Sequence, residues 1–131
     1  MKNLLMLLLL ALPCLAISQD DLDKPKDMGI AEFDEFKNNA FDIFKKSQNF
    51  KKMVDDGQKF TAEDVKAVDA LKNDIAALQE KSEAVVKKAK DVKPMTKAPA
   101  ATKNTQAATK ALKRSSENLA YVTENMVKEE E

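Results

Sequence analysis

The chain has 131 residues, of which 22 are basic and 22 acidic, and it contains one Cys, one Tyr, two Gly and no His or Trp. Without His, and with its single Cys in a segment that export would remove, the chain lacks the imidazole bases, thiolates and zinc ligands on which many active sites depend. The composition is rich in Ala, Lys, Glu, Leu and Asp and poor in strongly β-forming residues, and it predicts an all-α protein. We expect no enzymatic activity, no cofactor and no metal site.

Residues 1–18 have the pattern of a secretory signal peptide. Lys2 is followed by an apolar run from Leu4 to Leu12, and small residues occupy two of the positions from Ala16 to Ser18, where a signal peptidase would cut. The apolar run is far shorter than the ~20 residues that a transmembrane helix needs, and the proline before Cys14 disfavours a lipoprotein. We therefore expect a secreted, extracellular protein that has no transmembrane segment and no Cys after cleavage.

After cleavage, residues 19–29 are short, polar, acidic and interrupted by Pro25, which predicts a disordered leader. A helix is predicted over about 30–56, because apolar positions there recur at steps of three and four residues. Gly57 can take the left-handed backbone conformation that ends many helices. The predicted inward stripe of this first helix is Phe33, Phe36, Ala40, Ile43, Ser47, Phe50 and Val54.

A second helix is predicted over about 61–92. Thr61 can cap its first turn, and Asp64 stands in the position that a glutamate takes in a capping box. The stripe continues to Val92, and Pro94 then interrupts the helical pattern. Its inward positions are Val68, Leu71, Ile75, Leu78, Ser82, Val85, Ala89 and Val92.

A third helix is predicted over about 101–128, after a connector at 94–99 that contains two prolines. Short connections make consecutive helices neighbours, so residues 30–131 are expected to form an up-down-up antiparallel three-helix bundle. The alternative is a longer helical hairpin that completes its core as a homodimer. The third stripe consists of Thr105, Ala108, Leu112, Ser115, Leu119, Val122 and Met126.

Two features of the stripes indicate where a ligand or a partner would bind. All six Phe lie between Phe33 and Phe60, and Phe41 stands beside the stripe, so that either a broad buried face covers it or it forms an exposed patch. Folding the three stripes together places Ala40, Leu78 and Ser115 at one level, which is thin unless the helices close on it. The candidate residues for a ligand or partner face are Phe36, Phe41, Phe44, Leu78 and Leu112.

Charge is unevenly distributed along the chain. The stretch from Pro94 to Ser116 has basic side chains and no acidic ones, while the flanking regions are acidic. We interpret the basic stretch either as a solvated helix face or as a surface for an anionic partner. No aromatic residue is interleaved with these lysines, so nucleic acid is not an expected partner.

The run from Asn49 to Val92 resembles part of a known family. Phe60-Thr61-Ala62-Glu63-Asp64-Val65, Leu78-Gln79-Glu80-Lys81-Ser82 and Lys88-Ala89-Lys90 are similar to segments of the secreted, all-helical fatty-acid- and retinol-binding proteins of nematodes. The resemblance covers about a third of the chain. It implies a carrier of fatty acids or retinoids in a helical cavity, and it transfers no individual binding residue.

Together these observations favour a secreted, non-enzymatic helical protein that binds a hydrophobic small ligand or lipid. The alternative is a protein-interaction module that acts through the Phe-rich helix face or through self-association. A third hypothesis is that the helices open and insert reversibly into a lipid surface.

Overall fold

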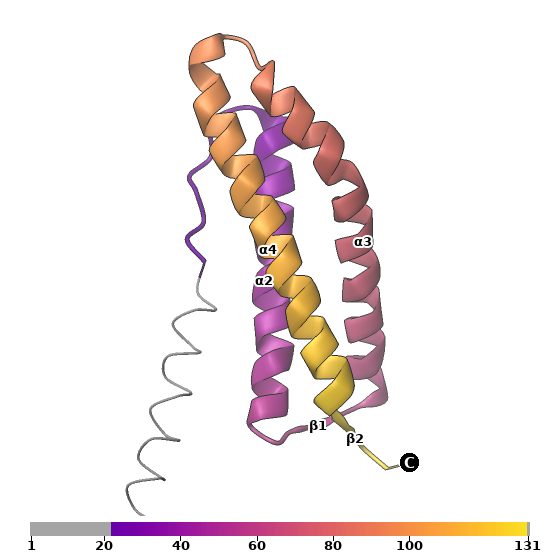
Figure 1. Cartoon of the computed structure of the whole chain (residues 1–131). Helices are drawn as coiled ribbons and strands as arrows, with labels where there is room; N and C mark the ends of the chain where they lie inside the picture. The colour runs from indigo at the N-terminus through magenta and orange to yellow at the C-terminus, as the bar shows by residue number, and fades with distance from the viewer. Residues whose placement is uncertain (1–21, 131) are drawn as a thin grey trace, which may run out of the picture.

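The computed structural model describes residues 22–130, so the predicted signal peptide and Cys14 lie outside the described residues. The chain forms an all-α bundle of three helices that run up, down and up in antiparallel order, as predicted (Figure 1). The predicted helix bounds differ from the observed ones by three residues or fewer. The elements are α2 (Ala31–Asp55), β1 (Lys59–Phe60), α3 (Ala62–Lys90), η1 (Met95–Lys97), α4 (Ala98–Asn125) and β2 (Val127–Lys128).

The turn between α2 and α3 follows the local chemistry that the sequence indicates. Gly57 has φ 72°, in the left-handed region, and its N–H donates to Val54 O at 3.0 Å. At the start of α3, the Asp64 N–H donates to Thr61 Oγ1 at 3.1 Å, and the Thr61 N–H donates to Asp64 Oδ2 at 3.0 Å. The predicted capping box is therefore present, and it satisfies backbone groups that helix formation leaves without partners.

The third helix lies earlier in the chain than predicted. Helix α4 begins at Ala98 because Pro99 falls in its first turn, where a missing N–H costs nothing. It ends at Asn125, where Met126 adopts an extended conformation and the next two residues pair in parallel with β1. The Glu129 N–H also donates to Phe60 O at 2.9 Å. The helix predicted to reach 128 is thus replaced over its last turn by backbone pairing with β1, just before α3.

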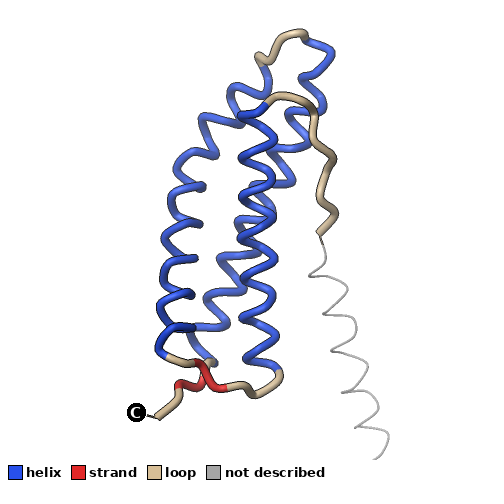
Figure 2. The backbone as a smooth tube through the Cα atoms, turned by 180° about the vertical axis from the view of Figure 1, so that it is seen from behind, coloured by secondary structure: helices blue, strands red, loops and turns tan. Residues whose placement is uncertain are grey.

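Helices α2 and α4 pack closely, and α3 packs less extensively against α2 (Figures 1 and 2). The close contact follows from the small side chains that α2 and α4 bury, since small residues let two helix backbones approach. Within the contact, Asn118 Nδ2 donates to Ser47 Oγ at 3.2 Å, and Ser47 Oγ donates to Phe44 O at 2.7 Å. The small buried residues of the two helices are Ala40, Ser47, Ala101, Ala108, Ala111 and Ser115.

Residues 22–30, which we call the strap, run beside α2 and α4 on the side away from α3 (Figures 1 and 2). The strap has no regular secondary structure, but Leu22, Met28 and Ile30 pack against the core. Its Asp27 accepts a hydrogen bond from Lys37 Nζ at 2.5 Å, and the whole Lys37 residue is 0 % exposed. Within residues 22–30, the ion pair holds the strap near α2, because a buried ammonium requires a carboxylate partner.

We predict that Ala108→Leu lowers the free energy of unfolding by about 1–3 kcal/mol, because extra methylene groups do not fit a close-packed contact. Ala108 is 0 % exposed between α2 and α4. The matched control is Ala77→Leu on the exposed face of α3, for which we expect a change within about 0.5 kcal/mol. Urea unfolding followed by circular dichroism measures both, and equal effects would contradict the close contact.

We also predict that the strap is released by acid. The hydrogen bond from Lys37, followed by that from Asn38, holds the pKa of Asp27 below its ordinary value of 3.8. A carboxyl group whose pKa is lower in the folded than in the unfolded state contributes its full stabilisation of the fold at pH values above the unfolded pKa. This contribution is lost as the pH falls through the folded pKa. The protection factors of residues 22–30, which compare the intrinsic with the observed rate of hydrogen exchange at each pH, should therefore be constant above about pH 4 and fall below it.

The comparison variant for this prediction is Asp27→Asn, in which the protection factors of the strap should be low at every pH at which the helices remain folded. Asp23→Asn removes an exposed carboxylate of the strap, and it should behave like the parent protein. If Asp27→Asn left the strap as protected as it is in the parent, Asp27 would not be its anchor.

Candidate functional site

The five residues predicted to line a ligand or partner face do not converge on one pocket. Phe36 and Leu78 lie together at a groove between α2 and α3. Phe41 and Phe44 form an edge-to-face ring pair with centroids 6.5 Å apart, and both are buried. Leu112 is 1 % exposed in the core. The structure thus assigns two of the five to an accessible site and three to the interior.

Phe41 is only 8 % exposed, so it does not form an exposed apolar patch. Helix α2 is covered on several sides, by α4, by α3 and by the strap, and its buried face is therefore wider than a coiled-coil stripe. That face includes Lys37 and Phe44, which lie one helical turn before and after Phe41. Of the two interpretations that the sequence left open, the broad buried face is the one found.

The thin level of Ala40, Leu78 and Ser115 is closed on one side only. Ala40 and Ser115 are both 0 % exposed, because α2 and α4 have drawn together there. Leu78 on α3 remains half-buried, and no residue from Ala76 to Ala84 is buried. The space that the small side chains leave at this level is therefore an open groove beside the middle of α3 and not an enclosed cavity.

The open space between α2 and α3 is a groove of about 490 Å³, which we call the α2–α3 groove. Its floor is apolar, with Phe36 and Val85 buried at 5 % and 7 % exposure and Leu78 half-buried. Its rim is charged and exposed. The lining residues are Glu32, Glu35, Phe36, Asn39, Leu78, Lys81, Ala84, Val85 and Lys88.

One ion pair crosses the α2–α3 groove. Lys88 Nζ lies 2.8 Å from Glu32 Oε1, and the two side chains are 62 % and 45 % exposed. An ion pair this exposed to solvent contributes about 1 kcal/mol or less, so it does little to hold α3 against α2. The side chain of Lys81, also on the rim, makes no ion pair or hydrogen bond with any residue in the described range.

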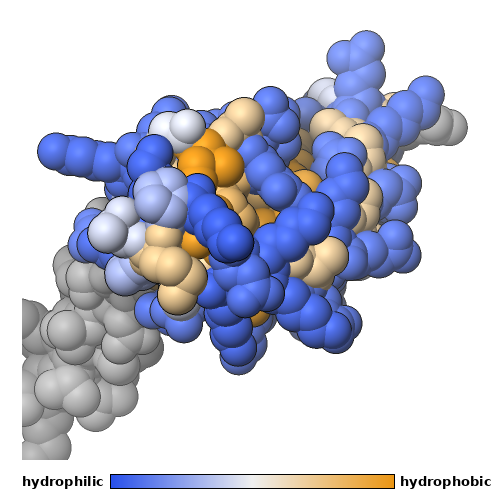
Figure 3. Space-filling model, turned by 90° about the horizontal axis from the view of Figure 1, so that it is seen from above, coloured by the Kyte–Doolittle hydropathy of each residue, from blue (hydrophilic) through white to orange (hydrophobic). Residues whose placement is uncertain are grey.

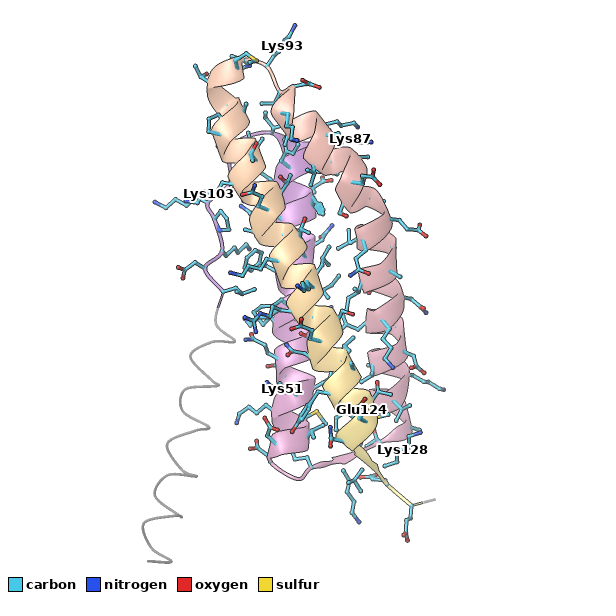
Figure 4. The ribbon with its side chains drawn as sticks, viewed as in Figure 1. Lys51, Lys87, Lys93, Lys103, Glu124 and Lys128 are labelled. Atoms are coloured by element: carbon cyan, nitrogen blue, oxygen red, sulfur yellow. The ribbon has the colours of Figure 1, made fainter. Side chains whose placement is uncertain are left out.

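A second groove, of about 420 Å³, lies on the other side of α3 between α3 and α4. Ile75 and Leu119 form its apolar floor, and Lys72 and Glu124 stand at its rim (Figure 4 labels Glu124). Sequence reasoning did not single out this groove. The signal was present in the small residues Ala76, Ser116 and Ala120, which flank the stripes and leave space between the helices.

The single Tyr takes part in a polar contact at the opposite end of the bundle from the α3–α4 turn. Tyr121 Oη donates to Asp55 Oδ1 at 2.6 Å, and Lys51 Nζ lies 5.7 Å from the centre of the Tyr121 ring. The hydrogen bond to Asp55 raises the pKa of Tyr121 above its ordinary value of 10.0. A tyrosine held protonated on an exposed surface supports the join between α2 and α4 and offers no acid or base near neutral pH.

Two further properties bear on the kind of site that residues 22–130 can offer. Among them, no three His, Cys, Asp or Glu side chains come together as a metal site. Within the same residues, no helix combines the length and hydropathy needed to cross a bilayer. Comparison with models of known protein families, with curated proteins and with solved structures finds no match for this chain.

We predict that Asp55→Asn lowers the pKa of Tyr121 toward 10.0, because the carboxylate that favours the protonated phenol is removed. Tyr121 is the one Tyr of the chain and no Trp is present, so ultraviolet absorbance titrates this phenol without interference. Asp56→Asn, next in the chain, is the matched control and should leave the titration unchanged. Identical curves for Asp55→Asn and the parent would show that the hydrogen bond does not persist in solution.

Proposed function

We propose that the protein is a secreted, non-enzymatic carrier that holds an amphipathic ligand with an apolar chain in the α2–α3 groove. The observation that carries the proposal is the half-buried side chain of Leu78, in the middle of α3. It lies beside the buried Phe36 of α2, whereas other apolar positions in the stripe of α3 are buried. An apolar chain laid on this floor would cover apolar surface that the fold leaves in contact with water.

The dimensions and charges of the groove suit such a ligand. A volume of about 490 Å³ lies within the range of ~300–1,000 Å³ usual for small-molecule sites. The ammonium of Lys81, which has no partner among residues 22–130, would meet an anionic head group at the rim while the apolar chain of the ligand contacts Phe36, Leu78 and Val85. A fatty acid is the simplest ligand that combines these two features.

The packing of α3 supports entry of a ligand from the side. The exposed ion pair between Lys88 and Glu32 adds little to the closed arrangement. From Ala76 to Ala84, α3 has no buried side chain whose exposure would oppose a small outward movement. The capping box and the β1–β2 pairing hold the first turn of α3 in place at the other end.

Three exposed alanines of α3 provide a matched test. Ala84 lines the α2–α3 groove, Ala76 lines the α3–α4 groove, and Ala77 lines neither. We predict that Ala84→Trp fills the α2–α3 groove and lowers affinity for a fluorescent fatty acid by about tenfold or more, because the indole occupies the chain's place. Ala76→Trp and Ala77→Trp should bind like the parent. Fluorescence titration measures the affinities, and circular dichroism confirms that each variant is folded.

Several results would contradict the proposal. Absence of binding of any lipophilic probe by the parent would remove the carrier function. Loss of binding in Ala76→Trp but not in Ala84→Trp would move the site to the other side of α3. Equal loss in all three variants would show that the tryptophans act on the helix and not on a groove.

Lys81→Gln separates recognition of the head group from contact with the chain. We predict that it weakens binding of a fluorescent fatty acid by about three- to tenfold, because one charge-assisted hydrogen bond is lost. Binding of the corresponding uncharged alcohol should not change. Lys72→Gln, on the rim of the other groove, is the matched control, and an equal effect on acid and alcohol would assign Lys81 no role in recognising the head group.

A further inference from the structure

The α3–α4 turn, at one end of the bundle, is rich in lysine. From Ala84 to Ser116 the single acidic residue is Asp91, and this run folds over the α3–α4 turn. The lysines of this run that lie nearest the turn are those we call the basic end: Lys87, Lys88, Lys90, Lys93, Lys97 and Lys103. Figure 4 shows Lys93 at the apex of the turn, with Lys87 and Lys103 on its two flanks.

Only part of this charge is neutralised locally. Lys87 pairs with Glu83 at 3.3 Å and Lys88 pairs with Glu32 at 2.8 Å. The side chains of Lys90, Lys93 and Lys97 form no ion pair or hydrogen bond with any residue from 22 to 130. These three flank the turn itself: Lys90 is the last residue of α3, and Lys97 immediately precedes α4.

An exposed apolar side chain stands among these lysines. Met95 is 68 % exposed in η1, and its neighbours Lys93, Pro94 and Thr96 are exposed as well. Seen from this end, apolar surface shows between hydrophilic side chains (Figure 3). A surface that combines a protruding apolar residue with surrounding cations is typical of proteins that dock on membrane interfaces.

Interaction with the helix dipole explains the lysines on the α3 side of the turn but not those on the α4 side. Lysines in the last turn of α3 favour the helix dipole there. Lys97 precedes α4, however, and the first turn of α4 contains no acidic residue and has no side-chain cap. A cation at a helix N-terminus interacts unfavourably with the helix dipole. The positive charge on the α4 side of the turn therefore does not stabilise α4, and it suggests a role in binding.

We propose that the basic end docks the intact bundle on an anionic lipid surface, with Met95 entering the head-group layer. Lysine ammonium groups act as point charges that suit a layer of anionic head groups, whereas bidentate phosphate recognition favours arginine. The turn contains no aromatic residue on which nucleic acid bases could stack. Docking goes beyond the carrier function and does not require that the α2–α3 groove hold a ligand.

The test uses protein recovered from a secreting host, with its N-terminus identified by mass spectrometry. Partition onto phosphatidylcholine vesicles with and without phosphatidylserine is measured by sedimentation. Each lysine near an anionic surface strengthens partition by about fivefold, so Lys90→Gln/Lys93→Gln/Lys97→Gln should weaken it by about 100-fold. The charge-matched control is Lys52→Gln/Lys59→Gln/Lys128→Gln at the opposite end of the bundle, whose lysines are also exposed.

We expect binding that requires phosphatidylserine, falls with salt, decreases in Met95→Ser and leaves helicity unchanged. Ala84→Trp should keep vesicle binding while it loses the fatty acid, so that failure of docking and failure of the carrier function are distinguished. The proposal is overturned by equal loss in the two triple variants, by equal binding to neutral vesicles, or by no binding at low salt. Binding to polyglutamate or RNA as tightly as to vesicles, unaffected by Met95→Ser, would also overturn it in favour of a general polyanion surface.

Discussion

The close contact between α2 and α4 is the constraint on which the rest of the molecule depends. Small side chains along both helices bring the backbones together, and the hydrogen bond from Asn118 to Ser47 lies inside the contact, where no buried polar side-chain atom of the described residues is left unsatisfied. This buried polar pair favours one register of the two helices, because a shift would leave the Asn118 amide without its partner while Ser47 kept its bond to Phe44 O.

The grooves on both sides of α3 follow from that contact. A three-helix bundle with evenly spaced helices would have sunk Leu78 into the centre, but α2 and α4 meet there through Ala40 and Ser115 and leave it little space. Helix α3 is therefore seated by Val68, Leu71 and Ile75 in its first half and by Val85 and Ala89 near its end, with no buried residue from Ala76 to Ala84. The middle of α3 is the part of the fold best suited to accommodate a ligand.

The fold was largely predictable from the sequence, and the site was predictable only in part. Three stripes, a capping box and Gly57 are local signals, and each corresponds to an observed element. Whether Phe41 is buried depends on what covers α2, and periodicity along one helix cannot show which neighbours surround it. The pairing of β1 with β2 joins residues far apart in the chain, and two-residue strands leave no periodic signal.

Lys37 shows why the strap belongs to the fold although its composition predicts disorder. In the sequence, Lys37 lies on the flank of an amphipathic helix, a position that a lysine usually occupies with its head group in water. In the structure its side chain is 1 % exposed, and Asp27, whose side chain is 63 % exposed, brings the carboxylate to it. The exposed carboxylate loses little hydration in this pairing, whereas the buried ammonium would lose much without it. Satisfying this buried charge therefore adds to the apolar contacts of Leu22, Met28 and Ile30 and to the hydrogen bonds from the Met28 and Gly29 N–H groups to Asp34 in holding the strap in place.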